Sequence, residues 1–297
     1  MRPCLLFITI FCFLNSKAQK ITTTESEEKF HNGIRNAICT NIYRTDIKNI
    51  LIEWLNYLKQ FKHEAITVNR NEVYGHNLFL KNIINRPIDI YTYFELVKET
   101  QTIKMNCTID VGAGNYLKSS VDTNEIKEEE KMVKDFAIKM TKAPYEALLK
   151  ASNLKRDNLI KDNLSLDKEI KNANEDIVDY AKKLVKLQKD SSEKSAEVLK
   201  NYQELESQKK INDTITVKES AFALASKKTM EKLLNQKNDA EDDSKNLNTK
   251  IKALREKIYR SETDVKVNGE FIIKNKGEIE NQKLIADDLK KKLAQIN

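Results

Sequence analysis

Glycine and proline are scarce in this chain, with only 6 Gly and 3 Pro among 297 residues. Folds with many strand-to-helix turns, including most nucleotide-binding enzymes, use several times more of both. Apolar residues are also few, at 40% against roughly 45–50% in ordinary globular domains, whereas charged residues reach 33% against roughly 25%. This composition excludes one compact core for the whole chain and favours long helices.

Long apolar runs are absent apart from Leu5 to Leu14, which is about half the roughly 20 residues that a membrane span requires. This run follows Arg2, and Ser16 and Ala18 occupy the −3 and −1 positions of a cleavage site. We predict a signal peptide over residues 1–18, cleaved near Ala18, and therefore export to the periplasm or the cell exterior. The alternative for this run is a membrane anchor. No stable membrane span is expected elsewhere.

Cysteine is limited to four residues, of which Cys4 and Cys12 lie in the predicted signal peptide. The remaining pair, Cys39 and Cys107, suits a disulfide in an exported chain. Such a bond would close a loop of nearly seventy residues and contribute on the order of 4 kcal/mol. The alternative is that both are buried thiols that act as small hydrophobic residues. The sequence leaves both interpretations open.

The net charge of the chain is +7, which falls to +5 when Arg2 and Lys17 leave with the signal peptide. Lysine and glutamate are interleaved along the chain and do not gather in one patch. Interleaved charges are typical of solvated helix faces with pairs four residues apart. We therefore expect no nucleic-acid partner.

Residues 19–123 change hydrophobic period several times, which indicates a small α+β domain. A helix over 45–61 is predicted by one apolar stripe at three- and four-residue steps. Alternating apolar and polar residues predict an antiparallel pair of strands at 88–96 and 103–111. Shorter strand candidates are 36–42, 65–69 and 73–80. The expected fold is an antiparallel sheet of about four strands packed on helices.

Residues 124–297 carry two heptad seams. A helix is expected to begin here, because Asp122 and Glu125 form a capping arrangement. The first seam has steps of four and three residues: Leu166, Ile170, Ala173, Ile177, Tyr180, Leu184 and Leu187. The second repeats every seven residues: Ile251, Ile258, Val265, Ile272, Ile279, Ala286 and Leu293. Together they predict a long antiparallel coiled-coil hairpin.

The hairpin has three irregular places. Its turn is predicted near 211–215, where Asn-Asp-Thr is flanked by two isoleucines. Pro144 is expected to kink the first arm or to separate residues 125–141 as a helix of the small domain. Residues 264–273 contain the Asn-Gly pattern of a β-hairpin, but the heptad that runs through them favours a helix.

The second seam has a companion row whose middle is polar: Ser261, Asn268, Asn275 and Gln282. Polar residues at buried heptad positions lower stability and select one register. We therefore interpret this row as aligning the helices, or as the place where a third helix or the small domain takes over the packing.

One string has the look of a catalytic motif. Residues 109–115, Ile-Asp-Val-Gly-Ala-Gly-Asn, resemble the first motif of S-adenosylmethionine-dependent methyltransferases. However, Tyr116 stands where that family has a further glycine, and charged helices follow in place of alternating strands and helices. We interpret Gly112 and Gly114 as turn residues and assign no cofactor and no catalytic residue.

Histidine is limited to three residues, His31, His63 and His76, which share no metal-ligand spacing. Surface or loop positions are expected for all three. We assign no metal site.

Four short segments resemble a family of uncharacterised exported coiled-coil proteins from Bacteroidetes: 16–19, 53–57, 133–137 and 282–293. The resemblance covers most of the chain and implies an envelope location and the two-part layout. That family has no assigned activity, so no functional residue is transferred from it. Pro144 departs from its usually unbroken helix.

These observations predict a non-catalytic structural or protein-interaction protein of the bacterial envelope. The coiled coil would serve as a spacer or an oligomerisation surface, with an unidentified protein or a second copy as partner. A second hypothesis is a membrane-active helical protein resembling pore-forming toxins, in which the apolar segment 221–225 enters lipid. The third is a methyltransferase-like enzyme.

Overall fold

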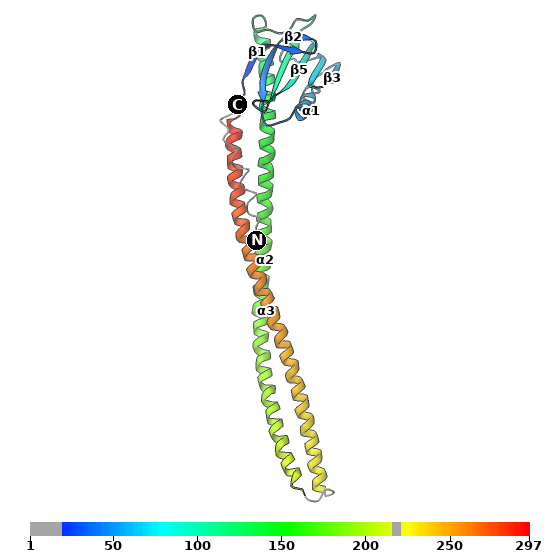
Figure 1. Ribbon diagram of the computed structural model, residues 1–297, viewed down its shortest axis with the longest axis vertical. Coiled ribbons are helices and arrows are strands. Elements are labelled where there is room, and N and C mark those ends of the chain that lie inside the picture. Colours follow the sequence, from blue (N-terminus) through cyan, green and yellow to red (C-terminus); the bar gives the residue numbers. More distant parts are fainter. Residues whose placement is uncertain (1–19, 216–220) are drawn as a thin grey trace. The chain divides into compact units, whose positions relative to one another are not determined.

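The computed structural model describes residues 20–215 and 221–297, so the predicted signal peptide at 1–18 lies outside the described residues. Six strands and one short helix come first, and two long helices follow (Figure 1). The strands are β1 Thr23–Phe30, β2 Gly33–Ile42, β3 Ala65–Asn69, β4 Glu72–Leu78, β5 Ile88–Val97 and β6 Thr102–Asp110. The helices are α1 Ile47–Leu58, α2 Thr123–Asp213 and α3 Ala221–Gln295. The expected α+β class is confirmed.

The sheet has six antiparallel strands in the order β1-β2-β6-β5-β4-β3, so the expectation of about four strands is wrong. The strand that the sequence did not reveal is β1. Its sequence, TTESEEKF, has polar or charged residues at all but the last position and therefore lacks an apolar alternation. Such a sequence suits an edge strand, because charges on an edge oppose pairing with other chains. β1 pairs along its whole length with β2.

The inner face of the sheet packs on helices. α1 contributes Ile50, Trp54 and Leu58, which are all fully buried. The first turns of α2 contribute further apolar side chains, among them Val133 and Phe136. The Trp54 indole Nε1–H also donates a 3.0 Å hydrogen bond to Thr92 Oγ1 on β5, so its one polar atom is satisfied within the core.

The C-terminal end of α3 completes this core. Leu289 and Ile296 are buried members of the same apolar cluster as the sheet and α1. The backbone N–H of Ile21 also donates a 3.1 Å hydrogen bond to the carbonyl of Asn297. The small domain is therefore closed by residues from both ends of the described chain, which the sequence did not predict.

α2 continues through Pro144 without a break, so residues 125–141 do not form a separate helix. A proline inside a helix costs about 3 kcal/mol, because one hydrogen bond is lost and its ring meets the preceding turn. Packing on both sides offsets this cost here. Met140, Thr141 and Tyr145 are buried, and Thr141 Oγ1 accepts a 3.2 Å hydrogen bond from the N–H of Tyr43.

The chain divides into two compact units. The first contains the described residues up to Arg156 together with Asn281–Asn297, and we call it the head. The second is Asp157–Glu280, and we call it the hairpin unit. In the hairpin unit α2 ends at Asp213, inside the range 211–215 where the turn was predicted. α3 is helical throughout 264–273, as the heptad favoured, and no β-hairpin interrupts it there.

The two long helices pack closely, as a helical hairpin requires. Every residue of the first seam, 166–187, is half-buried, and every residue between the seam positions is exposed. The second seam and its polar companion row are likewise buried or half-buried from Leu247 to Ile296. Both seams are therefore confirmed as the packed faces of α2 and α3.

Polar side chains bridge the two helices at the seam. In the hairpin unit, Asn275 Nδ2 donates to Asn163 Oδ1 at 2.9 Å, and Ser191 Oγ donates to Asn248 Oδ1 at 3.3 Å. In the head, Ser152 Oγ donates to Gln282 Oε1 at 2.9 Å. Residue numbers on α3 fall as those on α2 rise, which is the order of antiparallel neighbours. Two members of the polar row, Asn275 and Gln282, thus hydrogen-bond across the helix pair.

We predict that Leu289→Ala lowers the unfolding free energy of the protein by about 2–5 kcal/mol, because it leaves a cavity in the head core. The matched control is Leu284→Ala, five residues earlier on α3, where the side chain is 60% exposed. This control should cost less than about 0.5 kcal/mol. Denaturant titration followed by the fluorescence of the single tryptophan, Trp54, measures both. Equal losses would contradict the packing of the α3 end into the head.

Candidate functional site

The second face of the sheet, which we call the outer face, is built from strand residues. Its buried cluster consists of Phe30, Ala37 and Cys39, with Tyr91 and Tyr93 packed against them. These residues come from β1, β2 and β5. The outer face carries aromatic and charged side chains in place of the aliphatic residues of the inner face, so it is the candidate interaction surface of the head.

The β1–β2 end of the sheet bends over the outer face. The backbone N–H of His31, in the turn between β1 and β2, donates a 2.7 Å hydrogen bond to Glu72 Oε1 at the start of β4. Glu28 on β1 forms a 2.7 Å ion pair with Lys104 on β6. Burial raises the pKa of Glu28, but its hydrogen bonds and ion pair outweigh that effect and leave the pKa lowered. This bend explains how outer-face residues become buried.

Arg35 is the central charge of the outer face. Its guanidinium carbon lies 3.9 Å from the ring centre of Tyr91, 4.9 Å from that of Tyr116 and 5.7 Å from that of Phe30. A guanidinium stacked on aromatic rings is held by cation–π attraction. The residue is only 7% exposed, and its Nη1 has no hydrogen-bond partner among the described residues. Two buried neighbours on β6, Asn106 Oδ1 and Thr108 Oγ1, likewise lack a partner among the described residues.

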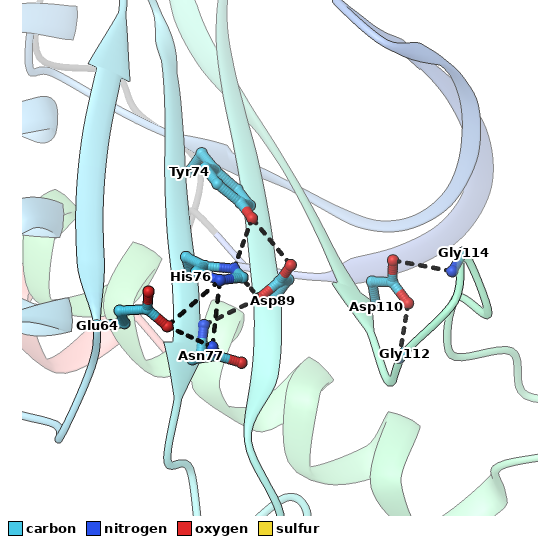
Figure 2. Close-up of polar contacts among 8 residues, drawn as sticks. All are labelled: Glu64, Tyr74, His76, Asn77, Asp89, Asp110, Gly112 and Gly114. Carbon is cyan, nitrogen blue, oxygen red and sulfur yellow. Dashed lines mark hydrogen bonds and ion pairs between the residues drawn. The ribbon is translucent and has the colours of Figure 1, made fainter.

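A hydrogen-bonded network lies further along the same face, on β4 and β5. Figure 2 shows Tyr74, His76 and Asp89 pointing toward one another. The Tyr74 hydroxyl donates to Asp89 Oδ2 at 2.9 Å, and His76 Nδ1 lies 2.9 Å from Asp89 Oδ1. Burial, and next the bond to Asp89, raise the pKa of Tyr74, which therefore remains a donor. The Tyr74 ring stacks on Tyr91 at 4.7 Å, which joins the network to the Arg35 cluster.

The Asp89–His76 contact resembles half of a hydrolytic triad, but its other side differs. His76 Nε2 lies 3.1 Å from Asn77 Nδ2 and 3.5 Å from Glu64 Oε2, where a triad has a serine, threonine or cysteine. The network therefore ties β4 to β5. His76 lies in strand β4 and not in a loop, and its side chain is 38% exposed at the surface. The alternating pattern of β4 places Tyr74 and His76 on one face of the sheet. The sequence alone does not show that Asp89 of β5 lies beside them.

The glycine string at 109–115 forms a turn after β6. Gly112 and Gly114 have φ angles of 119° and 79°, which favour glycine. The carboxylate of Asp110 accepts hydrogen bonds from both backbone N–H groups, at 2.7 and 3.2 Å (Figure 2). These N–H groups are the donors that a cofactor would need, and Asp110 already occupies them. Tyr116 then forms a β-bridge back to Asp110, and no helix follows directly.

Cys39 and Cys107 are both free thiols and both buried. Cys107 pairs in register with Ile38, so Cys39, the next residue of β2, points to the opposite face of the sheet. Cys39 lies 3.2 Å from Ser26 Oγ on the outer face, and Cys107 lies 3.7 Å from Thr92 Oγ1 in the core. Burial raises the pKa of Cys39 to about 11 and raises that of Cys107 well above its usual value. Of the two interpretations, the structure has the buried thiols.

Glu129 is an ionisable group inside the head core. It lies on α2, is fully buried beside Cys107, and its Oε1 has no hydrogen-bond partner among the described residues. Burial raises the pKa of this carboxyl well above its usual range and so favours the neutral acid. Sequence reasoning missed it, because Glu128, Glu129 and Glu130 read together as a solvated helix start.

A cavity of about 700 Å³ lies between the end of α1, the segment after β4, and α2. Its lining combines aromatic, apolar and lysine side chains: Tyr57, Phe61, Phe79, Met132, Lys62 and Lys131. This volume falls in the range of small-molecule sites. The carboxylates of Glu128 and Asp135 also line it, so its charges select no single class of ligand.

The described part of the chain, residues 20–215 and 221–297, holds no group of three or more His, Cys, Asp or Glu side chains placed to bind a metal. None of its helices is long and apolar enough to cross a bilayer. The segment proposed to enter lipid, 221–225, forms the first turn of α3, with Phe222 and Leu224 exposed and Ala223 buried.

Comparison with known proteins adds no assignment. No protein-family model matches the chain, and no curated protein matches it. The functional argument therefore depends on the residues and geometry described above.

We predict that Cys39 and Cys107 are free thiols that do not react while the protein is folded. Iodoacetamide should leave Cys39 and Cys107 unmodified in native buffer and alkylate both in denaturant, because the thiolate that reacts is suppressed by burial. Mass spectrometry without reductant measures this. A protein that gains two alkyl groups only after reduction would show a disulfide instead.

We predict that Glu129→Gln makes stability less dependent on pH. The folded state keeps the Glu129 proton, whereas the unfolded state releases it near the ordinary pKa of about 4.3. The unfolding free energy of the wild type should therefore fall as the pH rises above that value, until the raised pKa is passed. Denaturant titrations between pH 5 and 8 measure this slope. Glu146→Gln, at an exposed position on the same helix, should keep the wild-type slope. Equal slopes for all three proteins would contradict the assignment.

Proposed function

We propose that this protein is a non-catalytic, exported interaction protein of the bacterial envelope. The head binds a protein partner, and the coiled-coil hairpin acts as a spacer or as a surface for self-association. The apolar N-terminal run and the family resemblance support the exported location.

The observation that carries this proposal is the construction of the hairpin unit. Residues Asp157–Glu280 form a compact unit whose described residues are helical except at the turn, and it is packed along one seam. The α2 part of this unit extends for about 85 Å at 1.5 Å per residue. A two-helix seam of this kind adds length with little enclosed volume. The hairpin unit therefore supplies length and an extended lateral surface.

The outer face of the head supports the binding role. Tyrosine and arginine are enriched at protein interfaces and dominate their energetic hot spots. Tyr74, Tyr91 and Tyr116 form a continuous row of half-buried side chains across the sheet, and the buried Arg35 packs against Tyr91 and Tyr116. This row suits contact with another protein better than it suits proton transfer. In its His–Asp pair, the second ring nitrogen of His76 already contacts Asn77 and Glu64.

Site-specific photo-crosslinking in the native host tests this function. One probe replaces Tyr93 on the outer face, a second replaces Thr214 beyond the end of α2, and a control replaces Phe271 on the exposed side of α3. We expect one defined protein to be captured repeatedly at Tyr93 or Thr214 and to be absent at Phe271. Capture of no protein at either probe, from a folded and correctly located chain, would contradict the proposed role.

A further inference from the structure

The hairpin unit carries a second apolar stripe outside the seam. Leu164, Val178, Val185 and Leu199 lie on α2 at intervals of 14, 7 and 14 residues, so they share one line along the helix. Their side chains are 53% to 67% exposed. Single exposed apolar residues are ordinary on protein surfaces, whereas four at one heptad position form a contact strip.

The apolar residues of this stripe are arranged symmetrically about its midpoint. The heptad positions between the four apolar residues hold Lys171 and Ser192, which gives the order Leu, Lys, Val, Val, Ser, Leu. If a second copy lies antiparallel, with the midpoint between residues 181 and 182, Leu164 faces Leu199, Val178 faces Val185, and Lys171 faces Ser192. A two-fold symmetric contact requires such a self-complementary surface.

The adjacent heptad row repeats this symmetry. It contains Ile160, Asp167, Asn174, Ala181, Gln188, Ser195 and Tyr202. The small residue Ala181 stands at the centre, amides lie on either side of it, and the apolar Ile160 and Tyr202 close the two ends. Asp167 would face Ser195, so neither row opposes like charges between these ends. Beyond these two ends, Asp157 would face Glu206. Repulsion between the two carboxylates limits the contact to residues 160–202.

α3 adds apolar surface to the same side of the hairpin unit. Tyr259 and Ile273 are 71% and 72% exposed, and each follows a seam residue by one position, as Val178 follows Ile177. In two antiparallel helices, positions that follow the seam by one residue lie on the same side of the pair, because the two helices turn in opposite senses when viewed from one end. The stripe on α2 and these two residues therefore belong to one face.

The size of this face is adequate for a dimer. Residues 160–202 extend for about 65 Å, and a helix with its side chains is about 10 Å wide, which gives roughly 650 Å² from α2 alone. A stable interface buries about 800 Å² per partner. Tyr259 and Ile273 supply further area on α3.

We infer that this face of the hairpin unit binds the same face of a second copy of the chain, antiparallel, about a two-fold axis near Ala181. Four helices then pack side by side. The inference rests on the proposed function, in which the hairpin is a spacer or a self-association surface, and it names the partner of that surface.

Sedimentation velocity over a concentration series of the mature chain tests the dimer. Val178→Glu and Val185→Glu place charges at the centre of the contact and should each raise the dimer dissociation constant by at least about tenfold. Phe271→Glu, at a 50% exposed position on the other side of α3, should leave the constant unchanged. A monomer at every concentration overturns the inference, as does a dimer that neither valine variant weakens.

Disulfide trapping tests the antiparallel register in the same protein. Ala181→Cys should form a disulfide with its own copy on mild oxidation, because it lies beside the axis. Leu164→Cys should not link to itself, since the two copies of that position are about 50 Å apart, but it should link to Leu199→Cys in a mixture. Self-linking of Leu164→Cys indicates a parallel pair and overturns the inference.

The dimer and the proposed function fail in distinguishable ways. A Val178→Glu monomer that is still crosslinked to the same protein through Tyr93 or Thr214 shows that the interaction role stands without self-association. If the wild type forms the antiparallel dimer but no partner is captured, the dimer stands and the head-binding role fails.

Discussion

The seam between α2 and α3 is the constraint on which the hairpin unit depends. Between Asp157 and Glu280 the buried side chains lie along this one line, and most other helix positions are exposed. A two-helix seam is narrow, so its register has to be specified by something besides apolar contact. Asn163 and Asn275, hydrogen-bonded at 2.9 Å, are matched polar positions that a shifted register would leave buried and unpaired.

The same two helices close the head. The inner face of the sheet is covered by α1, by the first turns of α2, and by the last turns of α3 with the residues that follow, where Leu289 and Ile296 are buried. The helices therefore cover the inner face and leave the outer face uncovered by helix. Arg35 and the tyrosines lie on that outer face. A buried acid, Glu129, sits within the covered side, where burial favours its neutral form. The helices and the proposed interaction surface thus occupy opposite faces of one sheet.

Much of the fold could be predicted from the sequence because it is periodic. The two seams, the long strands β5 and β6, and helix α1 each follow one clear hydrophobic period. β1 could not be found, because an edge strand of charged residues has no such period. The low helix propensity of proline would predict that α2 ends at Pro144. The helix continues instead, and the neighbouring Tyr145 is buried. The packing of Ile296 into the head depends on contacts far apart in sequence, which no local pattern encodes.

The candidate site was the least predictable part. Arg35, Tyr91 and Tyr116 come from different segments and meet only because β2, β6 and β5 are neighbours and β1–β2 bends over them.

The central claim is that α2 and α3 pair antiparallel within one chain. The most direct measurement is a pulsed electron–electron distance between spin labels at Lys189 and Lys250, in labelled protein diluted with an excess of unlabelled protein. The account predicts one short distance that survives dilution, whereas a long distance, or a short one lost on dilution, would contradict it.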